Sequence, residues 1–207
     1  MIRKLIYFFC CMLPYLALAQ VQMSPAEVSA FKKSLQKAKE IKTLETDFVQ
    51  YKHMSFIKKP VESTGKLYVQ HPDRLSWSYT SPFAYKMVFK AGKVLINDQG
   101  KRQSIDVSNS KQFEKISHLV SSAIRGEEYN EKEFAVSYLK EAGGSTIKLV
   151  PKTTDTKRYI KEISLLFSGS DNLVREIILR EPSGDYTRFV LKNRKINTKL
   201  HDSVFNF

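Results

Sequence analysis

The segment Tyr68-Val-Gln-His-Pro-Asp-Arg-Leu-Ser-Trp-Ser-Tyr79 has the pattern that decides the fold class. It contains one strand-like stretch, a proline break and a second stretch in which Leu75, Trp77 and Tyr79 alternate with polar residues. An alternation with a period of two places these three side chains on one face of a β-strand. The segment therefore predicts two consecutive strands, the second of which has an aromatic and apolar face.

Similar patterns recur along most of the chain. Turn signals such as Ser81-Pro82 and Gln99-Gly100 separate them. Short strands joined by tight turns are typical of an antiparallel meander that curls into a barrel or half-barrel. We predict eleven strands, near residues 46–56, 63–70, 74–80, 84–90, 93–98, 101–107, 133–140, 145–151, 158–168, 172–181 and 184–192.

Two helices are expected beside the strands. The segment Ser24-Pro25-Ala26-Glu27 has the pattern of a capping box with proline at the first helical position. An apolar stripe that should pack against the sheet follows it, formed by Val28, Phe31, Leu35 and Ala38. A second helix is predicted between Lys111 and Ile124, in a connection, 108–132, that is long for an antiparallel strand pair. It covers one mouth of the barrel or packs on the edge of the sheet.

Residues 1–19 have the features of a secretory signal peptide. A basic start precedes an apolar run from Leu5 to Leu16, and Ala17-Leu-Ala19 is a small-x-small cleavage site. An uncleaved membrane anchor is the alternative, but the apolar run is short for a bilayer span. We therefore expect an exported protein whose mature form is one domain, residues 20–207.

The composition restricts the possible functions. Cys10 and Cys11 are the two cysteines of the chain, and both lie in the predicted signal peptide, so the mature domain would have no disulfide and no cysteine ligand. The formal charge is +13, and loss of Arg3 and Lys4 would lower it by only two. A basic surface favours anionic lipid, an acidic protein face or nucleic acid. Export and the scatter of basic residues argue against nucleic acid, and a solvated exterior without a partner is the alternative.

No arrangement of residues in the sequence indicates catalysis. There is no nucleophile elbow and no glycine loop that would bind phosphate. The histidines lack the spacing of a metal site, since they lie far apart at His53, His71, His118 and His201. We expect neither an enzyme nor a metal or cofactor.

The apolar strand faces instead suggest a cavity for an apolar ligand. Most such residues form the ordinary core of a protein. The stretch from Trp77 to Phe89, however, concentrates aromatic side chains around a methionine, and methionine adapts to varied apolar shapes. We predict that the ligand is contacted by Phe48, Leu75, Trp77, Tyr79, Met87 and Phe89.

Several short motifs occur in a fixed order along the chain. They are Phe48-Val-Gln50, Gly65-Lys-Leu67, His71-Pro-Asp-Arg-Leu-Ser-Trp77, Pro82, Lys86-Met-Val-Phe-Lys-Ala-Gly92 and the closing Ser203-Val-Phe-Asn-Phe207. Together with the signal peptide and the first helix, these motifs resemble the LolA family of periplasmic outer-membrane lipoprotein carriers. The resemblance covers essentially the whole mature chain.

The resemblance implies a mainly β fold, an unclosed antiparallel β-barrel of about eleven strands, with an N-terminal helix and a lid helix over an apolar cavity. In the family this cavity takes up the acyl chains of lipoproteins. An inner-membrane ABC-type lipoprotein-releasing complex loads the carrier and an outer-membrane acceptor unloads it, and the carrier itself binds no ATP or other cofactor. We expect a monomeric periplasmic chaperone of this kind.

His71 departs from the family's pattern. The family usually has an arginine directly before this proline, and that arginine ties the lid to the barrel by hydrogen bonds. Histidine donates hydrogen bonds but lacks the guanidinium fork, so we expect His71 to replace the latch only in part. This departure leaves open a carrier of another lipid or glycolipid precursor. A periplasmic lipid-sensing regulator is a further alternative.

Overall fold

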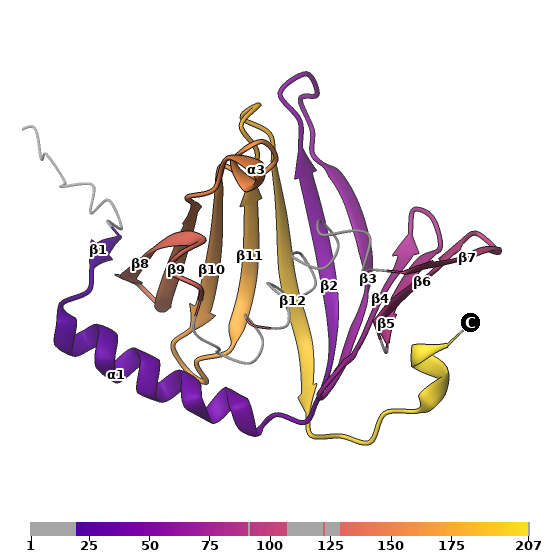
Figure 1. Ribbon diagram of the computed structural model, residues 1–207, viewed down its shortest axis with the longest axis horizontal. Helices are drawn as coiled ribbons and strands as arrows, with labels where there is room; N and C mark the ends of the chain where they lie inside the picture. The colour runs from indigo at the N-terminus through magenta and orange to yellow at the C-terminus, as the bar shows by residue number, and fades with distance from the viewer. Residues whose placement is uncertain (1–19, 91, 107–121, 123–128, 207) are drawn as a thin grey trace, which may run out of the picture.

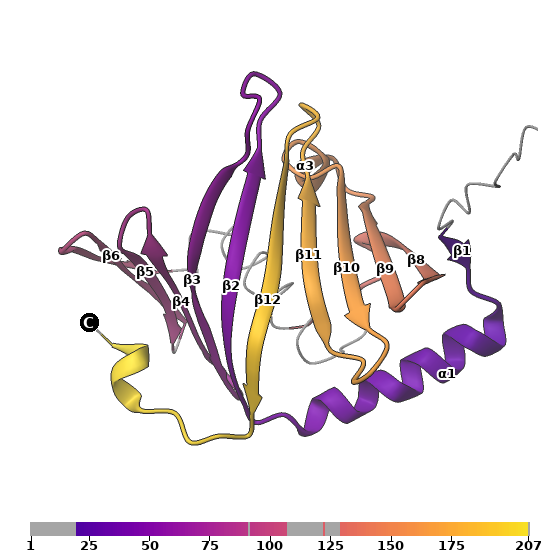
Figure 2. The same ribbon diagram turned by 180° about the vertical axis from the view of Figure 1, so that it is seen from behind.

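The computed structural model describes residues 20–90, 92–106, 122 and 129–206. Their strands form one antiparallel sheet of twelve strands in the order β1-β8-β9-β10-β11-β12-β2-β3-β4-β5-β6-β7. The sheet is strongly curved, and helix α1 passes below the lower ends of β9 to β12 (Figure 1, and from behind in Figure 2). The first and last strands of this order, β1 and β7, are edges, so the sheet is an unclosed barrel.

Neighbouring strands mostly follow one another in the chain. Two pairings are exceptions, since β12 returns to pair with β2, and β1 pairs with β8. The strands are β1 (Val21–Gln22), β2 (Thr43–His53), β3 (Val61–Gln70), β4 (Arg74–Ser81), β5 (Tyr85–Lys90), β6 (Lys93–Asp98), β7 (Lys101–Asp106), β8 (Phe134–Glu141), β9 (Gly144–Pro151), β10 (Glu162–Ser168), β11 (Val174–Arg180) and β12 (Tyr186–Ile196).

All eleven predicted strands are present, and the predicted fold class is confirmed. The twelfth, β1, has two residues, too few to show an alternation in sequence. The strand predicted at 158–168 begins only at Glu162, because the short helix α3 (Thr154–Lys157) comes before it. The backbone N–H of Ile160 continues this helical turn by donating to the carbonyl of Thr156 at 2.9 Å.

The capping box predicted before the first helix is present. Helix α1 (Pro25–Leu35) continues as a 3-10 helix, η1 (Gln36–Glu40). The Ser24 hydroxyl accepts a hydrogen bond from the Glu27 backbone at 3.4 Å, and a Glu27 carboxylate oxygen accepts one from the Ser24 backbone at 2.7 Å. These two bonds satisfy N–H groups that a helix start leaves unpaired.

The apolar stripe of this helix packs against the sheet, as predicted. Phe31, Leu35 and Ala38 are buried, and Val28 is partly buried. The ring of Phe31 meets the ring of Phe167 edge-on, with 5.4 Å between centroids. This contact fixes α1 against the inner face of β10.

The C-terminal 3-10 helix, η3 (Asp202–Phe205), packs against the outer face of β4 and β5. Phe205 is fully buried. Polar contacts surround it: Arg74 lies 2.7 Å from Asp202, and Lys86 Nζ donates to the carbonyl of Asn206 at 2.7 Å. The segment Asp202–Phe205 is therefore part of the packed structure.

Two predicted segments fall outside the described residues. The signal peptide at 1–19 is one, and the helix at 111–124 is the other, apart from Ser122, which is helical and buried. Both stay predictions. In the part of the chain that the structure describes, no helix combines the length and the apolar character needed to cross a membrane.

Candidate functional site

The six residues predicted to contact a ligand come together on the concave face of β2, β4 and β5. In the pairing of β4 with β5, Leu75 lies opposite Phe89 and Trp77 lies opposite Met87. Paired residues of neighbouring strands share a face of the sheet. Tyr79 pairs with Gly65 on β3, and Gly65 pairs in turn with Phe48 on β2, so these residues belong to the same face.

Phe48 is the centre of an aromatic cluster. Its ring centroid lies 5.3 Å from that of Trp77, 5.1 Å from that of Tyr79 and 6.2 Å from that of Phe189. Trp77 and Phe189 also contact each other at 5.1 Å. Phe189, on β12, was not among the predicted residues, because local alternation in sequence does not show that β12 lies beside β2.

The six residues differ in how far they are covered. Phe48 is 1% exposed, Leu75 4% and Trp77 7%, whereas Tyr79, Met87 and Phe89 are only partly buried. The first three form the closed floor of the site. Tyr79, Met87 and Phe89 keep part of their surface exposed, so contact with them does not require the first three to be displaced.

One hydrogen bond crosses this apolar face. The Tyr79 hydroxyl donates to Oε1 of Gln50 at 2.7 Å. Burial raises the pKa of Tyr79 from 10.0 to about 12, so the phenol stays neutral at alkaline pH values where a solvated tyrosine ionises. This pair of polar groups lies among hydrocarbon, an arrangement typical of sites for apolar ligands.

A small pocket lies where the lower ends of β2, β11 and β12 meet. Its volume is about 10 Å³, room for about one water molecule. The residues that line it are Ile41, Leu44, Leu173, Val174, Leu191 and Arg194. This pocket is too small for a long apolar ligand, so such a ligand would have to bind elsewhere on the concave face or push side chains apart.

His71 lies apart from the aromatic cluster, at the turn between β3 and β4. It is half-buried, and its backbone N–H donates to the carbonyl of Lys42 at 2.9 Å. The segment that it would latch, 108–132, lies mostly outside the described residues. The latch role of His71 therefore stays a prediction.

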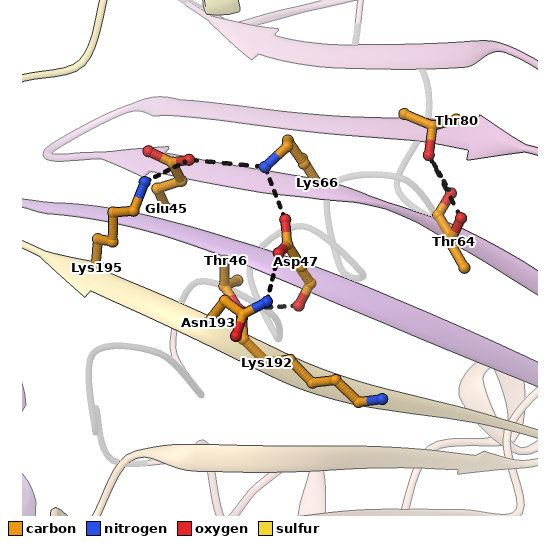
Figure 3. Close-up of polar contacts among 9 residues, drawn as sticks. All are labelled: Glu45, Thr46, Asp47, Thr64, Lys66, Thr80, Lys192, Asn193 and Lys195. Atoms are coloured by element: carbon orange, nitrogen blue, oxygen red, sulfur yellow. Dashed lines mark hydrogen bonds and ion pairs between the residues drawn. The ribbon is translucent and has the colours of Figure 1, made fainter.

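The opposite, convex face of β12, β2 and β3 is polar (Figure 3). Lys66 Nζ lies 2.8 Å from Asp47 and 3.8 Å from Glu45, and Lys195 lies 3.4 Å from Glu45. The Asn193 amide donates to Asp47 at 2.8 Å. The hydrogen bonds from Lys66 and Asn193 hold the pKa of Asp47 below its usual value. The two faces of these strands thus have opposite characters.

We also searched the described residues for side chains that could bind a metal ion. No group of three or more histidine, cysteine, aspartate or glutamate side chains is placed to hold a metal ion there. What the concave face can offer a ligand is a broad aromatic and aliphatic surface, which binds hydrocarbon by removing it from water.

Solved structures share this fold at low sequence identity. An uncharacterized conserved protein from Thermus thermophilus superposes with a TM-score of 0.53 at 7% identity, covering 87% of this chain and 94% of that chain. The complex of MucA and MucB from Pseudomonas aeruginosa gives a TM-score of 0.51 at 10% identity, covering 87% of this chain and 61% of that chain. These likenesses support the fold alone.

Sequence comparison is more specific. The outer-membrane lipoprotein carrier protein of Methylococcus capsulatus is 28% identical over 80% of this chain and 77% of the relative. The carrier protein of the same name from Dechloromonas aromatica is 26% identical over 82% of this chain and 78% of the relative. A model of the family described as outer membrane lipoprotein carrier protein LolA matches residues 39–207. The chain with this curved sheet and apolar concave face therefore belongs to the LolA family.

Proposed function

We propose that this protein is a periplasmic carrier that holds the acyl chains of lipoproteins against its concave face and moves them from the inner to the outer membrane. The observation that carries the proposal is the aromatic cluster around Phe48, continued by the accessible side chains of Tyr79, Met87 and Phe89, in a member of this family. An inner-membrane ABC-type complex would supply the cargo, and an outer-membrane acceptor would remove it.

Carriage of this kind needs no covalent chemistry, in keeping with a carrier rather than an enzyme. Burial of each methylene contributes about 0.8 kcal/mol, so full burial of long acyl chains would bind too tightly for release. The closed contacts of Phe48, Trp77 and Phe189 offer an opposing cost, because a chain that enters this floor must separate the rings. Partial burial on the accessible side chains would leave the cargo transferable.

The burial pattern decides which variant tests the proposal. A charge at Leu75 would be buried and would unfold the protein, because that side chain is 4% exposed. Met87 is only partly buried, so a glutamate there can stay hydrated while it places a charge within the apolar face. We expect Met87→Glu to weaken binding of a fluorescent triacylated peptide by at least tenfold, with an unchanged circular dichroism spectrum.

Met54 is a matched control, because it is a partly buried methionine in the β2–β3 hairpin, away from the cluster. Met54→Glu should bind the peptide as the parent protein does. Equal binding of the peptide by the parent protein, Met87→Glu and Met54→Glu would show that the concave face is not the acyl site.

His71 favours a second candidate, a carrier of another lipid, since the family usually has an arginine there. Mass spectrometry of lipids extracted from the protein purified from its own periplasm separates the two candidates. Triacylated lipoprotein would support the first, and a single non-protein lipid would support the second.

A further inference from the structure

The hairpin between β2 and β3 presents apolar side chains to solvent. Its tip, residues 54–61, extends beyond the neighbouring strand ends (Figure 1). Within this tip Phe56 is 78% exposed, Ile57 41% and Val61 42%. Exposed apolar groups gathered in one segment indicate an interaction site more often than single exposed residues do.

The tip has a defined structure that holds these side chains outward. A backbone hydrogen bond of 2.9 Å from Ile57 to Met54 closes the turn. The Ser55 backbone donates to the carboxylate of Asp185 at 2.9 Å, which ties the tip to the turn between β11 and β12. At the base of the tip, the ring of His53 stacks on that of Tyr186, with centroids 4.1 Å apart.

The charges beside the tip select the kind of partner. Residues 54–61 contain two lysines and no acidic residue, and both, Lys58 and Lys59, directly follow the apolar pair and are exposed. Two acidic side chains lie near the tip: Glu181 pairs with Lys52 at 3.6 Å, and Asp185 accepts the hydrogen bond from Ser55. An apolar group flanked by lysine suits the surface of an anionic bilayer, where the hydrocarbon enters the interface and the ammonium groups meet lipid phosphates. Phe83, which is 66% exposed, lies at the same end of the sheet in the turn between β4 and β5.

We propose that the hairpin tip, residues 54–61, docks this protein on anionic phospholipid membranes, with Phe56 and Ile57 entering the interface and Lys58 and Lys59 contacting phosphates. This proposal extends the proposed carrier function, because a carrier must meet two membranes. It uses a different part of the molecule from the acyl site, so the two can be tested separately.

The test is flotation of the cargo-free protein with vesicles of phosphatidylcholine, with and without about 30 mol % phosphatidylglycerol. The protein should float with the anionic vesicles, and less so as salt rises. The double variant Phe56→Ser, Ile57→Ser should bind at least tenfold more weakly. The double variant Lys58→Ser, Lys59→Ser should bind anionic vesicles about fivefold or more weakly, with no change on vesicles of phosphatidylcholine alone.

Ile196 supplies the matched control. It is 46% exposed, close to the value for Ile57, and it ends β12 at the opposite end of the sheet from the tip. Ile196→Ser should float like the parent protein. The proposal is wrong if the parent protein does not bind anionic vesicles, or if the Phe56 and Ile57 variant binds them equally well.

A readout of acyl binding distinguishes this proposal from the carrier function. The Phe56 and Ile57 variant should bind the triacylated peptide normally. Loss of vesicle binding with normal peptide binding supports membrane docking by the tip. If vesicles are not bound but the same variant slows cargo loading from a membrane complex, the tip contacts a protein, and the membrane assignment is wrong.

Discussion

Phe48 packs its ring against the backbone of Gly65 on the neighbouring strand. A Cβ atom at Gly65 would lie 2.6 Å from Cζ of Phe48 and 2.0 Å from the backbone oxygen of Ser78. Neither distance is compatible with van der Waals contact, so the missing side chain at residue 65 makes the space that the ring fills. This space allows Phe48 to reach Trp77 and Tyr79 together.

The first prediction concerns this close approach. Gly65→Ala should lower the free energy of unfolding by about 2–4 kcal/mol, because the backbone at Ser78 cannot move without disturbing the β3–β4 pairing. Urea denaturation measures the change. Gly92→Ala is the comparison, since Gly92 has a φ of +72° and open space around it, so only backbone strain of about 1–2 kcal/mol applies. Equal losses in the two variants would refute a steric role for Gly65.

Local pattern was enough to predict the strands and the first helix. Leu75, Trp77 and Tyr79 alternate within one strand, and Ser24 with Glu27 forms a cap within one helical turn, so each signal lies within a few residues. The same alternation placed Leu75, Trp77 and Tyr79 on one side of their strand and Met87 with Phe89 on one side of the next, and the structure has both sets on the same face.

Contacts between distant parts of the chain were not predictable in this way. The pairing of β12 with β2 brings Phe189 to Phe48, and no local period encodes that pairing. The packing of η3 and its Phe205 against the outer face of β4 and β5 is likewise a contact between distant parts of the chain. Such contacts decide which side chains of the concave face are buried and which stay accessible. The sequence could therefore predict which residues share a face but not how far each is buried.

The second prediction concerns the anchoring of the C-terminus. Phe205 is the last residue of η3 and is fully buried against β4 and β5, so Phe205→Ala should lower the free energy of unfolding by about 3–4 kcal/mol and free the segment from 198 onward to proteolysis. Asp202→Asn is the control. The Asp202 side chain is 80% exposed, and its ion pair with Arg74 should contribute less than about 1 kcal/mol. A larger loss from Asp202→Asn than from Phe205→Ala would mean that charge, not burial, holds η3.

The third prediction concerns alkaline pH. Burial raises the pKa of Tyr79 to about 12 from an ordinary value of 10.0. The folded protein therefore keeps a proton that the unfolded chain releases, so stability is full below pH 10 and falls as the pH rises towards 12. Tyr79→Phe should remove this contribution to the loss of stability at alkaline pH. It should also lower the free energy of unfolding at neutral pH by about 1 kcal/mol, because Gln50 loses its hydrogen-bond donor. Urea denaturation of both proteins at pH 7, 10 and 11.5 measures the cost at neutral pH and the loss of stability at alkaline pH. If stability falls equally in both proteins between pH 10 and 11.5, burial does not raise the pKa of this phenol.

The last prediction concerns acid and the start of α1. The pKa of Glu27 is lowered from 4.5 to about 2, chiefly by its hydrogen bond with Lys140 at 2.6 Å and then by the Ser24 backbone. A carboxyl group with a lowered pKa stabilises the fold above its unfolded value and loses that effect as the pH falls through the folded value. The stability difference between the parent protein and Glu27→Gln should therefore be constant above about pH 5 and shrink between pH 4.5 and 2. The carboxylate is at the surface, so added salt should also reduce the difference. A difference that persists at pH 2 would mean that Glu27 acts through packing of the helix start rather than through its charge.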